Sequence, residues 1–181
     1  MLQAGQPAPA FILPDADMES FDFHSLRGKH VVLFFYPKDD TPGCTLQATE
    51  FSDHEEEFAR HHSVIIGVSR DDCLTHAAFR DKHGLSVRLL ADTECEVCRL
   101  YGVWQSKELD GVKKMAILRS TFIIDKKGIV RHAMYGVTPR GHAAEVLDLI
   151  KQLDRKDAHA DRKEHRRDPE LPGVGPGRQS D

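Results

Sequence analysis

The sequence predicts an α/β fold in which a mixed central β-sheet is flanked by helices. Two observations lead to this fold class. Two apolar, β-prone runs are each followed by a stretch with helical spacing, an alternation that is typical of parallel strands. Two later apolar runs enclose a turn with a Lys-Gly pair, which favours an antiparallel hairpin in the same sheet. With 181 residues, of which 40% are apolar, the chain can bury one sizeable core, so we expect a single domain.

The first half of the chain begins with scaffold elements. Short apolar pieces within residues 10–23 flank a Pro-Asp turn and predict a small β-hairpin. Residues 31–36 are apolar at every position, as expected for a strand that is buried on both faces. From Cys44 to about Arg60 the apolar side chains keep helical spacing, so we expect one helix there. Residues 64–69 form the next buried strand.

The middle of the chain continues the alternation. Two aspartates can cap a helix over residues 71–83, and the glycine after it can end that helix. A short strand over residues 87–90 and a short helix over residues 92–101 follow. Residues 105–116 are rich in charged side chains, and we expect an exposed loop there.

The last third of the chain closes the sheet. Residues 120–124 and 129–134 are the two strands of the predicted hairpin, and residues 141–153 form an amphipathic helix. After it the composition changes, because residues 154–181 contain almost no large apolar side chains and many charged ones. Such a segment cannot bury enough surface to offset the entropy of ordering. We therefore expect one domain over residues 1–153 and a charged, disordered tail whose start can extend the last helix.

Charge and hydropathy exclude several classes of protein. The formal charge of −4 gives no electrostatic reason to expect nucleic acid or an anionic membrane as a partner. No stretch reaches the roughly 18 apolar residues needed to span a bilayer, and the first residues lack the basic and apolar regions of a signal peptide. A cytoplasmic protein is the expectation.

The sequence contains four cysteines, which in such a chain are more often reduced, catalytic or metal-binding than paired. Cys95 and Cys98 have the spacing of half a zinc site. A tetrahedral site needs two further ligands at suitable spacing, and His76 and His83 match this need poorly. We therefore expect no metal and no other cofactor.

Cys44 has a position that makes a thiol reactive. It follows a buried strand and a stiff turn that contains Pro37 and Pro42, and it lies in the first turn of the predicted helix. The unpaired N–H groups and the positive end of a helix stabilise a thiolate over a thiol. Thr41 offers a hydroxyl close enough to hydrogen-bond both the sulfur and an incoming oxygen ligand. The alternative is an ordinary buried cysteine that acts as a small apolar side chain.

Pro37, Thr41 and Cys44 match the Pro-x-x-x-Thr-x-x-Cys motif of the peroxiredoxins. The fuller run from Phe35 to Thr45 resembles the bacterioferritin comigratory protein (Q-type) branch of that family. Three further segments occur in the order that this branch shows: Gly67-Val68-Ser69, Tyr101-Gly102-Val103-Trp104 and Arg119-Ser120-Thr121-Phe122-Ile123-Ile124-Asp125. The resemblance covers about residues 1–153 and implies a thioredoxin-like fold.

The resemblance also implies a reaction and its residues. Cys44 would attack a peroxide, release water or an alcohol, and become a sulfenic acid. Thr41, the backbone amides near Gly43 and Cys44, and Arg119 would stabilise the charge that develops on the oxygens. Pro37 belongs to the same motif. The enzyme would reduce hydrogen peroxide and organic hydroperoxides, with thioredoxin or another thiol as reductant, as a monomer or weak dimer.

A different class of function stays open from the sequence, namely a thioredoxin-fold binding or chaperone-like protein that has no peroxidase turnover. The way in which Cys44 is recycled is also open. Many members of the branch carry a resolving cysteine five residues after the peroxidatic one, but Thr49 occupies that position here. Others carry it in the following helix, whose only cysteine here is Cys73 at its start. We expect a one-Cys-like peroxidase that an external thiol reduces, with resolution by Cys95 or Cys98 as the alternative.

Overall fold

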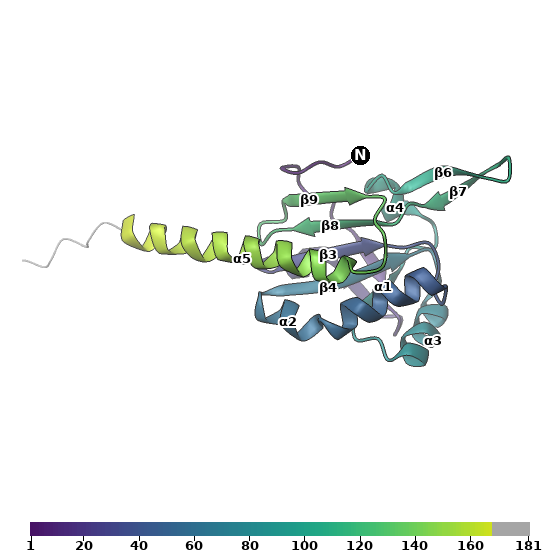
Figure 1. The fold of residues 1–181 in the computed structure, drawn as a ribbon, viewed down its shortest axis with the longest axis horizontal. Coiled ribbons are helices and arrows are strands. Elements are labelled where there is room, and N and C mark those ends of the chain that lie inside the picture. Colours follow the sequence, from purple (N-terminus) through teal and green to yellow (C-terminus); the bar gives the residue numbers. More distant parts are fainter. Residues whose placement is uncertain (168–181) are drawn as a thin grey trace, which may run out of the picture.

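A five-stranded sheet forms the centre of this computed structural model, which describes residues 1–167 (Figure 1). The strand order is β5-β4-β3-β8-β9; β4 pairs parallel with β3 and β5, and β8 pairs antiparallel with β3 and β9. The predicted mixed sheet and its closing hairpin are therefore confirmed. In chain order the elements are β1 (Ile12–Pro14), β2 (Ser20–Asp22), the 3-10 helix η1 (Phe23–Leu26), β3 (His30–Phe35), α1 (Pro42–Asp53), α2 (Glu55–Arg60), β4 (Ser63–Ser69), α3 (Cys73–His83), β5 (Arg88–Ala91), α4 (Glu96–Leu100), β6 (Trp104–Leu109), β7 (Val112–Ile117), β8 (Ser120–Ile124), β9 (Val130–Tyr135) and α5 (His142–Arg167).

The central strand β3 contributes side chains to two separate cores. Val32 and Phe34 pack with α1, α2, α3 and α5 on one face of the sheet, whereas Leu33 and Phe35 pack with η1 and α4 on the other. These side chains are fully buried because successive residues of a strand point to opposite faces. The sequence prediction of a strand buried on both sides is confirmed.

The helix predicted from Cys44 to about Arg60 is two helices. α1 begins earlier, at Pro42, and ends at Asp53, and α2 begins at Glu55. His54 interrupts the helix because its ring nitrogen Nδ1 lies 2.9 Å from the Glu50 carbonyl, an oxygen that the backbone ladder also uses. The acidic side chains in the first turn of α2 then favour a new helix N-terminus.

Residues 105–116 are mostly exposed, as predicted, but the prediction that they form a loop is wrong. These residues form the two-stranded hairpin of β6 and β7, which projects from the body of the molecule in Figure 1. Leu109 pairs with Val112, and both residues of the turn between them, Asp110 and Gly111, have positive φ angles of 53° and 77°. An Asp-Gly pair is a strong local signal for such a turn. The charged composition hid this signal, because most of the hairpin is exposed.

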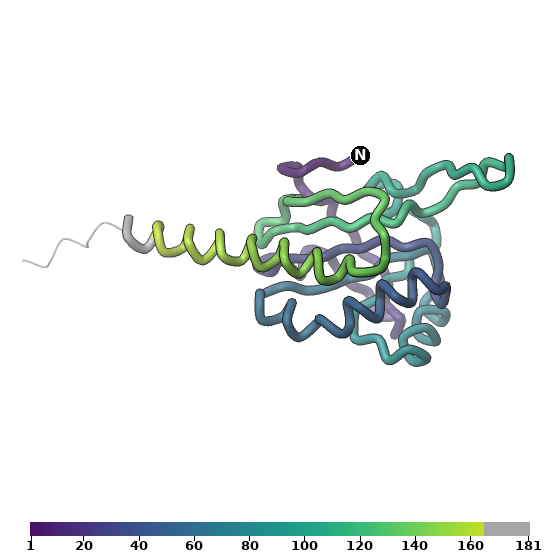
Figure 2. The backbone as a smooth tube through the Cα atoms, in the orientation of Figure 1, coloured from purple at the N-terminus to yellow at the C-terminus, as the bar shows by residue number. Residues whose placement is uncertain are grey.

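The final helix is longer than predicted. α5 runs to Arg167 instead of ending at residue 153, and its far end extends away from the body (Figure 2). The start of the tail therefore extends the last helix, as the sequence allowed, and the rest of the expected disordered tail, residues 168–181, lies outside the described residues. None of the helices within residues 1–167 is long and apolar enough to cross a membrane.

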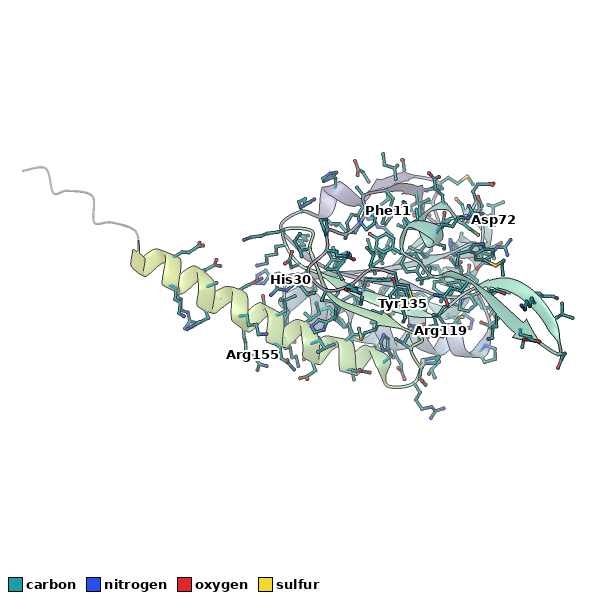
Figure 3. The ribbon with its side chains drawn as sticks, turned by 90° about the horizontal axis from the view of Figure 1, so that it is seen from above. Phe11, His30, Asp72, Arg119, Tyr135 and Arg155 are labelled. Atoms are coloured by element: carbon teal, nitrogen blue, oxygen red, sulfur yellow. The ribbon has the colours of Figure 1, made fainter. Side chains whose placement is uncertain are left out.

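Two aspartates anchor the polar part of α5 to the start of β3 and to the turn before β4. Asp157 Oδ2 lies 3.0 Å from Nε2 of His30, a fully buried side chain at the start of β3. The ring lacks a well-aligned hydrogen bond, and burial lowers its pKa although the charge of Asp157 acts in the opposite direction. Asp154 lies 3.1 Å and 3.2 Å from the Nδ1 atoms of His61 and His62. In Figure 3, His30 lies where α5 leaves the body.

This anchor gives a prediction for two truncated chains. Removal of residues 158–181 should change the melting temperature by less than about 2 °C, because the described side chains from 158 to 164 are exposed. Removal of residues 154–181 should lower it by roughly 5 °C, because His30 loses its partners at a cost of about 1.5 kcal/mol. Thermal unfolding of both chains measures the difference. Equal melting temperatures would contradict the anchor.

Candidate active site

Cys44 lies in the first turn of α1, as predicted. Thr41 is the N-cap residue and Pro42 occupies the first helical position, where a missing N–H costs nothing. The helical ladder begins with the bond from the Thr45 N–H to the Thr41 carbonyl, at 2.8 Å. The N–H groups of Gly43 and Cys44 therefore have no acceptor within the helix, and they form its positive end beside the sulfur.

Arg119 reaches the sulfur from a distant part of the chain. β8 pairs antiparallel with β3, so that Ser120 lies opposite Phe35 at the end of the strand that leads to Cys44. Arg119 immediately precedes β8 and thus lies beside the loop that carries the cysteine (Figure 3). Its Nη2 atom donates to Cys44 Sγ at 3.3 Å. The structure therefore brings together the two residues that the sequence connected only through the resemblance.

Gln47 holds the Arg119 side chain in place. Its Oε1 atom accepts a hydrogen bond of 2.6 Å from Arg119 Nη1. Gln47 lies one turn after Cys44 on the same face of α1, and it is fully buried. Sequence analysis did not identify this residue. A polar side chain three positions after the cysteine, within a stripe that is otherwise apolar, was the available signal.

Gly43 allows the guanidinium to approach the helix. A Cβ atom at this position would lie 3.2 Å from Arg119 Nη2 and 3.3 Å from Cγ of Pro139. Both distances are shorter than ordinary van der Waals contacts. The Cys44 residue is only 1% exposed, so the surrounding residues cover the sulfur almost completely.

Thr41 differs from its predicted arrangement. Its hydroxyl donates to the backbone carbonyl of Lys38 at 2.8 Å. A hydroxyl has one hydrogen, so in this arrangement Thr41 does not also donate to the sulfur. Its oxygen remains able to accept a hydrogen bond. Pro37 lies half-buried in the turn that leads to this residue.

The other three cysteines have different surroundings. Cys95 and Cys98 belong to the core on the opposite face of the sheet from Cys44. The prediction placed Cys95 and Cys98 within one helix. In the structure Cys95 is the N-cap of α4, with a φ of 56°, and only Cys98 lies within the helix. Burial is the largest cause that raises the pKa of each thiol, and a hydrogen bond with Asp92 adds to the effect at Cys98. Cys73 begins α3, and burial followed by the Asp72 charge raises its pKa.

Comparison with known proteins identifies the family. The model of the AhpC/TSA family matches residues 4–133. The chain belongs to this family. The AhpC/TSA match includes the loop of Cys44 and the strand that follows Arg119, so both site residues lie inside the family domain.

Individual relatives place the chain within the AhpC/TSA family. Peroxiredoxin Bcp of Bacillus subtilis is 41% identical over 155 residues, which are 86% of this chain and 99% of that protein. Peroxiredoxin Bcp of Escherichia coli is 35% identical over 151 residues, which are 83% and 97% of the two chains. A structure of the bacterioferritin comigratory protein of Xanthomonas campestris, concerned with its alkyl peroxide reduction activity, has a TM-score of 0.79 at 32% identity and covers 84% of this chain and 99% of that one.

These relatives confirm the predicted branch, the thioredoxin-like fold and the class of enzyme. The chain is a thiol-dependent peroxidase of the bacterioferritin comigratory protein (Q-type) branch. They do not support the alternative of a binding or chaperone-like protein without turnover.

The geometry predicts graded effects of two substitutions on the second-order rate constant for hydrogen peroxide. Arg119→Ala should lower it roughly a hundredfold or more, because a donor to the developing charge is lost. Gln47→Leu should lower it about tenfold, as expected when one charge-assisted hydrogen bond that orients Arg119 is removed. Stopped-flow kinetics of the reduced protein measure both constants.

The matched control is Gln152→Leu, because Gln152 makes an exposed hydrogen bond to Asp148 on α5. It should leave the rate constant unchanged. An unchanged constant in Arg119→Ala would contradict the assignment of this residue.

Proposed function

We propose that Cys44 is the peroxidatic cysteine and that the enzyme reduces hydrogen peroxide and organic hydroperoxides. The observation that carries this proposal is the 3.3 Å contact between Arg119 Nη2 and Cys44 Sγ at the N-terminus of α1. A guanidinium and a helix N-terminus both stabilise negative charge on the sulfur, and the thiolate is the nucleophilic form of cysteine.

The chemical step follows from these groups. The Cys44 thiolate attacks one oxygen of the hydroperoxide, the O–O bond breaks, and its electron pair leaves on the other oxygen. A proton taken up by that oxygen gives water or an alcohol, and the sulfur becomes a sulfenic acid. Arg119 and the free amides of Gly43 and Cys44 point toward the region where the charge moves from sulfur to oxygen. They are the groups that lower the barrier.

Thr41 and Pro37 have supporting roles in the same proposal. The Thr41 hydroxyl donates its hydrogen to the Lys38 carbonyl. Its oxygen can therefore accept the hydrogen of the incoming hydroperoxide and orient that substrate. Pro37 stiffens the turn between β3 and the cysteine, which keeps Thr41 at the helix start.

An external thiol completes the cycle. A disulfide needs Cα atoms within about 7 Å, and the sheet lies between Cys44 and the pair Cys95 and Cys98. Cys73 begins α3, a helix whose Phe79 packs in the same core as Cys44, but its raised pKa makes it a poor attacking thiol at neutral pH. We therefore propose a one-Cys-like cycle in which a thiol on thioredoxin or on another molecule reduces the sulfenic acid.

The same proposal covers location and assembly. A cycle through free thiols needs a reducing compartment, which favours the cytoplasm. The sheet edges are partly covered, because Asp15 bridges to Leu90 on β5 and Pro7 bridges to Ile129 beside β9. Covered edges disfavour pairing of sheets between copies, so a monomer or weak dimer is the proposed state.

A comparison of three proteins tests the proposal. Peroxide consumption with dithiothreitol, and then with thioredoxin, should be abolished in Cys44→Ser. It should remain within about twofold of the natural chain when Cys73, Cys95 and Cys98 are all replaced by alanine, since none of them takes part. Retained activity in Cys44→Ser would overturn the nucleophile. Loss of thioredoxin-dependent turnover in the folded alanine variant would overturn the one-Cys cycle.

A further inference from the structure

A second polar cluster lies beneath the active-site loop and has no part in the mechanism above. Asp39 Oδ1 accepts a hydrogen bond of 2.6 Å from the Tyr36 hydroxyl, and Asp39 Oδ2 lies 2.6 Å from Nδ1 of His76. His76 Nε2 lies 2.9 Å from the carbonyl of Leu90. The side chains of His76 and Asp39 are 0% and 1% exposed. Three elements meet here: the loop after β3, the helix α3 and the strand β5.

The acceptors around His76 determine how many protons its ring carries. The Leu90 carbonyl can only accept, so Nε2 carries a hydrogen. The Tyr36 hydroxyl donates to Asp39 Oδ1. Burial and then the Asp39 charge raise the pKa of Tyr36 well above its usual value, so this hydroxyl keeps its hydrogen and remains a donor. A carboxylate with short donors on both oxygens is stabilised in its ionised form. In a carboxylate–imidazolium pair, Nδ1 would donate the hydrogen of the 2.6 Å contact to Asp39.

A metal ion is the competing explanation of this cluster, because ligand atoms of Asp39, Asp71 and His76 lie within 4.8 Å of one another. Those ligand atoms already take part in hydrogen bonds. Asp71 Oδ2 accepts from the Asp39 N–H at 2.9 Å and from the Ser69 hydroxyl at 2.6 Å, and both nitrogens of His76 have partners. Hydrogen bonds therefore account for the cluster, and an ion would have to displace several of them.

Asp39 connects this cluster to the reaction. It lies in the turn between Pro37 and Thr41, where its Oδ1 accepts from Tyr36 at the start of the same loop. Its backbone N–H and its Oδ2 contact Asp71 and His76, which lie outside the loop that carries Cys44. We propose that Asp39 and His76 form a buried carboxylate–imidazolium pair that positions the active-site loop, and with it Thr41 and the first turn of α1. The proposal rests on Cys44 being the peroxidatic residue.

The pair has a consequence for two reactions of the same sulfur. While it is intact, Cys44 stays almost fully buried and in line with Arg119, an arrangement that suits a small peroxide. When it is broken, the loop and the first turn of α1 are less restrained. The peroxide reaction should then become slower because alignment is lost, whereas a bulkier alkylating reagent should react faster because the sulfur is more exposed.

The variants of the test are chosen to separate charge from hydrogen bonding. Asp39→Ala removes the partner of His76. Asp39→Asn can still accept from Tyr36 and can donate to a neutral His76, so it restores the hydrogen bonds without the charges. Asp40→Asn is the matched control, because Asp40 is the next residue and its carboxylate pairs with Lys82 and His83 on the surface.

Two rate constants are measured for each reduced variant, one with hydrogen peroxide and one with iodoacetamide. Asp39→Ala should react at least tenfold more slowly with peroxide and several-fold faster with iodoacetamide. Asp39→Asn should recover most of the peroxide rate. Asp40→Asn should match the natural chain within about twofold for both reagents. An unchanged peroxide rate in Asp39→Ala would overturn the positioning role. If Asp39→Ala does not fold, Tyr36→Phe replaces it, because this variant removes only one hydroxyl. Tyr36→Phe should also slow the peroxide reaction and speed up the iodoacetamide reaction, both by smaller factors.

Nitrogen-15 NMR of the His76 ring tests the pair without any enzyme activity. In metal-free natural protein at neutral pH both ring nitrogens should be protonated, and in Asp39→Asn only one. A singly protonated ring in the natural chain would overturn the carboxylate–imidazolium pair. A natural chain that shows the doubly protonated ring but consumes no peroxide would contradict the proposed function and not the pair.

Discussion

The contact between the Arg119 guanidinium and the Cys44 sulfur depends on the register of the central sheet. The two residues are 75 positions apart in the chain, and they meet because β8 lies antiparallel to β3 with Ser120 opposite Phe35. A shift of this pairing by one residue would turn the neighbouring side chains to the wrong face of the sheet. The register is fixed by apolar side chains of β3 that fill a core on each face. Packing far from the cysteine therefore sets the geometry of its chemistry.

The same sheet divides the thiols of the protein into two groups. Cys44 lies on the face covered by α1 and α5, next to a cation and a helix N-terminus, whereas Cys95 and Cys98 lie in the apolar core of the other face. The surroundings of these thiols therefore differ, and burial is the largest cause that raises the pKa of Cys95 and of Cys98. If Cys44 is the peroxidatic residue, as proposed, the sheet separates it from two other thiols that lie in an apolar core.

Local patterns in the sequence were sufficient for most of the scaffold and for the nucleophile. A buried strand, a proline turn and a cysteine at a helix start are all features of neighbouring residues, and the structure has each of them. Arg119 could be assigned only through the resemblance, because its role depends on a long-range strand register. The contacts of Gln47 and His76 could not be predicted either, because the partners of these residues lie 72 and 37 positions away in the chain. The hairpin of β6 and β7 was missed although its Asp-Gly turn is local, because an exposed hairpin has little hydrophobic alternation.

In the proposed reaction one sulfur, held between Arg119 and the start of α1, receives oxygen from the peroxide. The most direct measurement is mass spectrometry of the reduced natural protein after one equivalent of hydrogen peroxide in the presence of dimedone, which traps sulfenic acids. We expect a single adduct per chain, located on the peptide that contains Cys44. An adduct or a disulfide that forms first at Cys73, Cys95 or Cys98, with Cys44 unmodified, would contradict it.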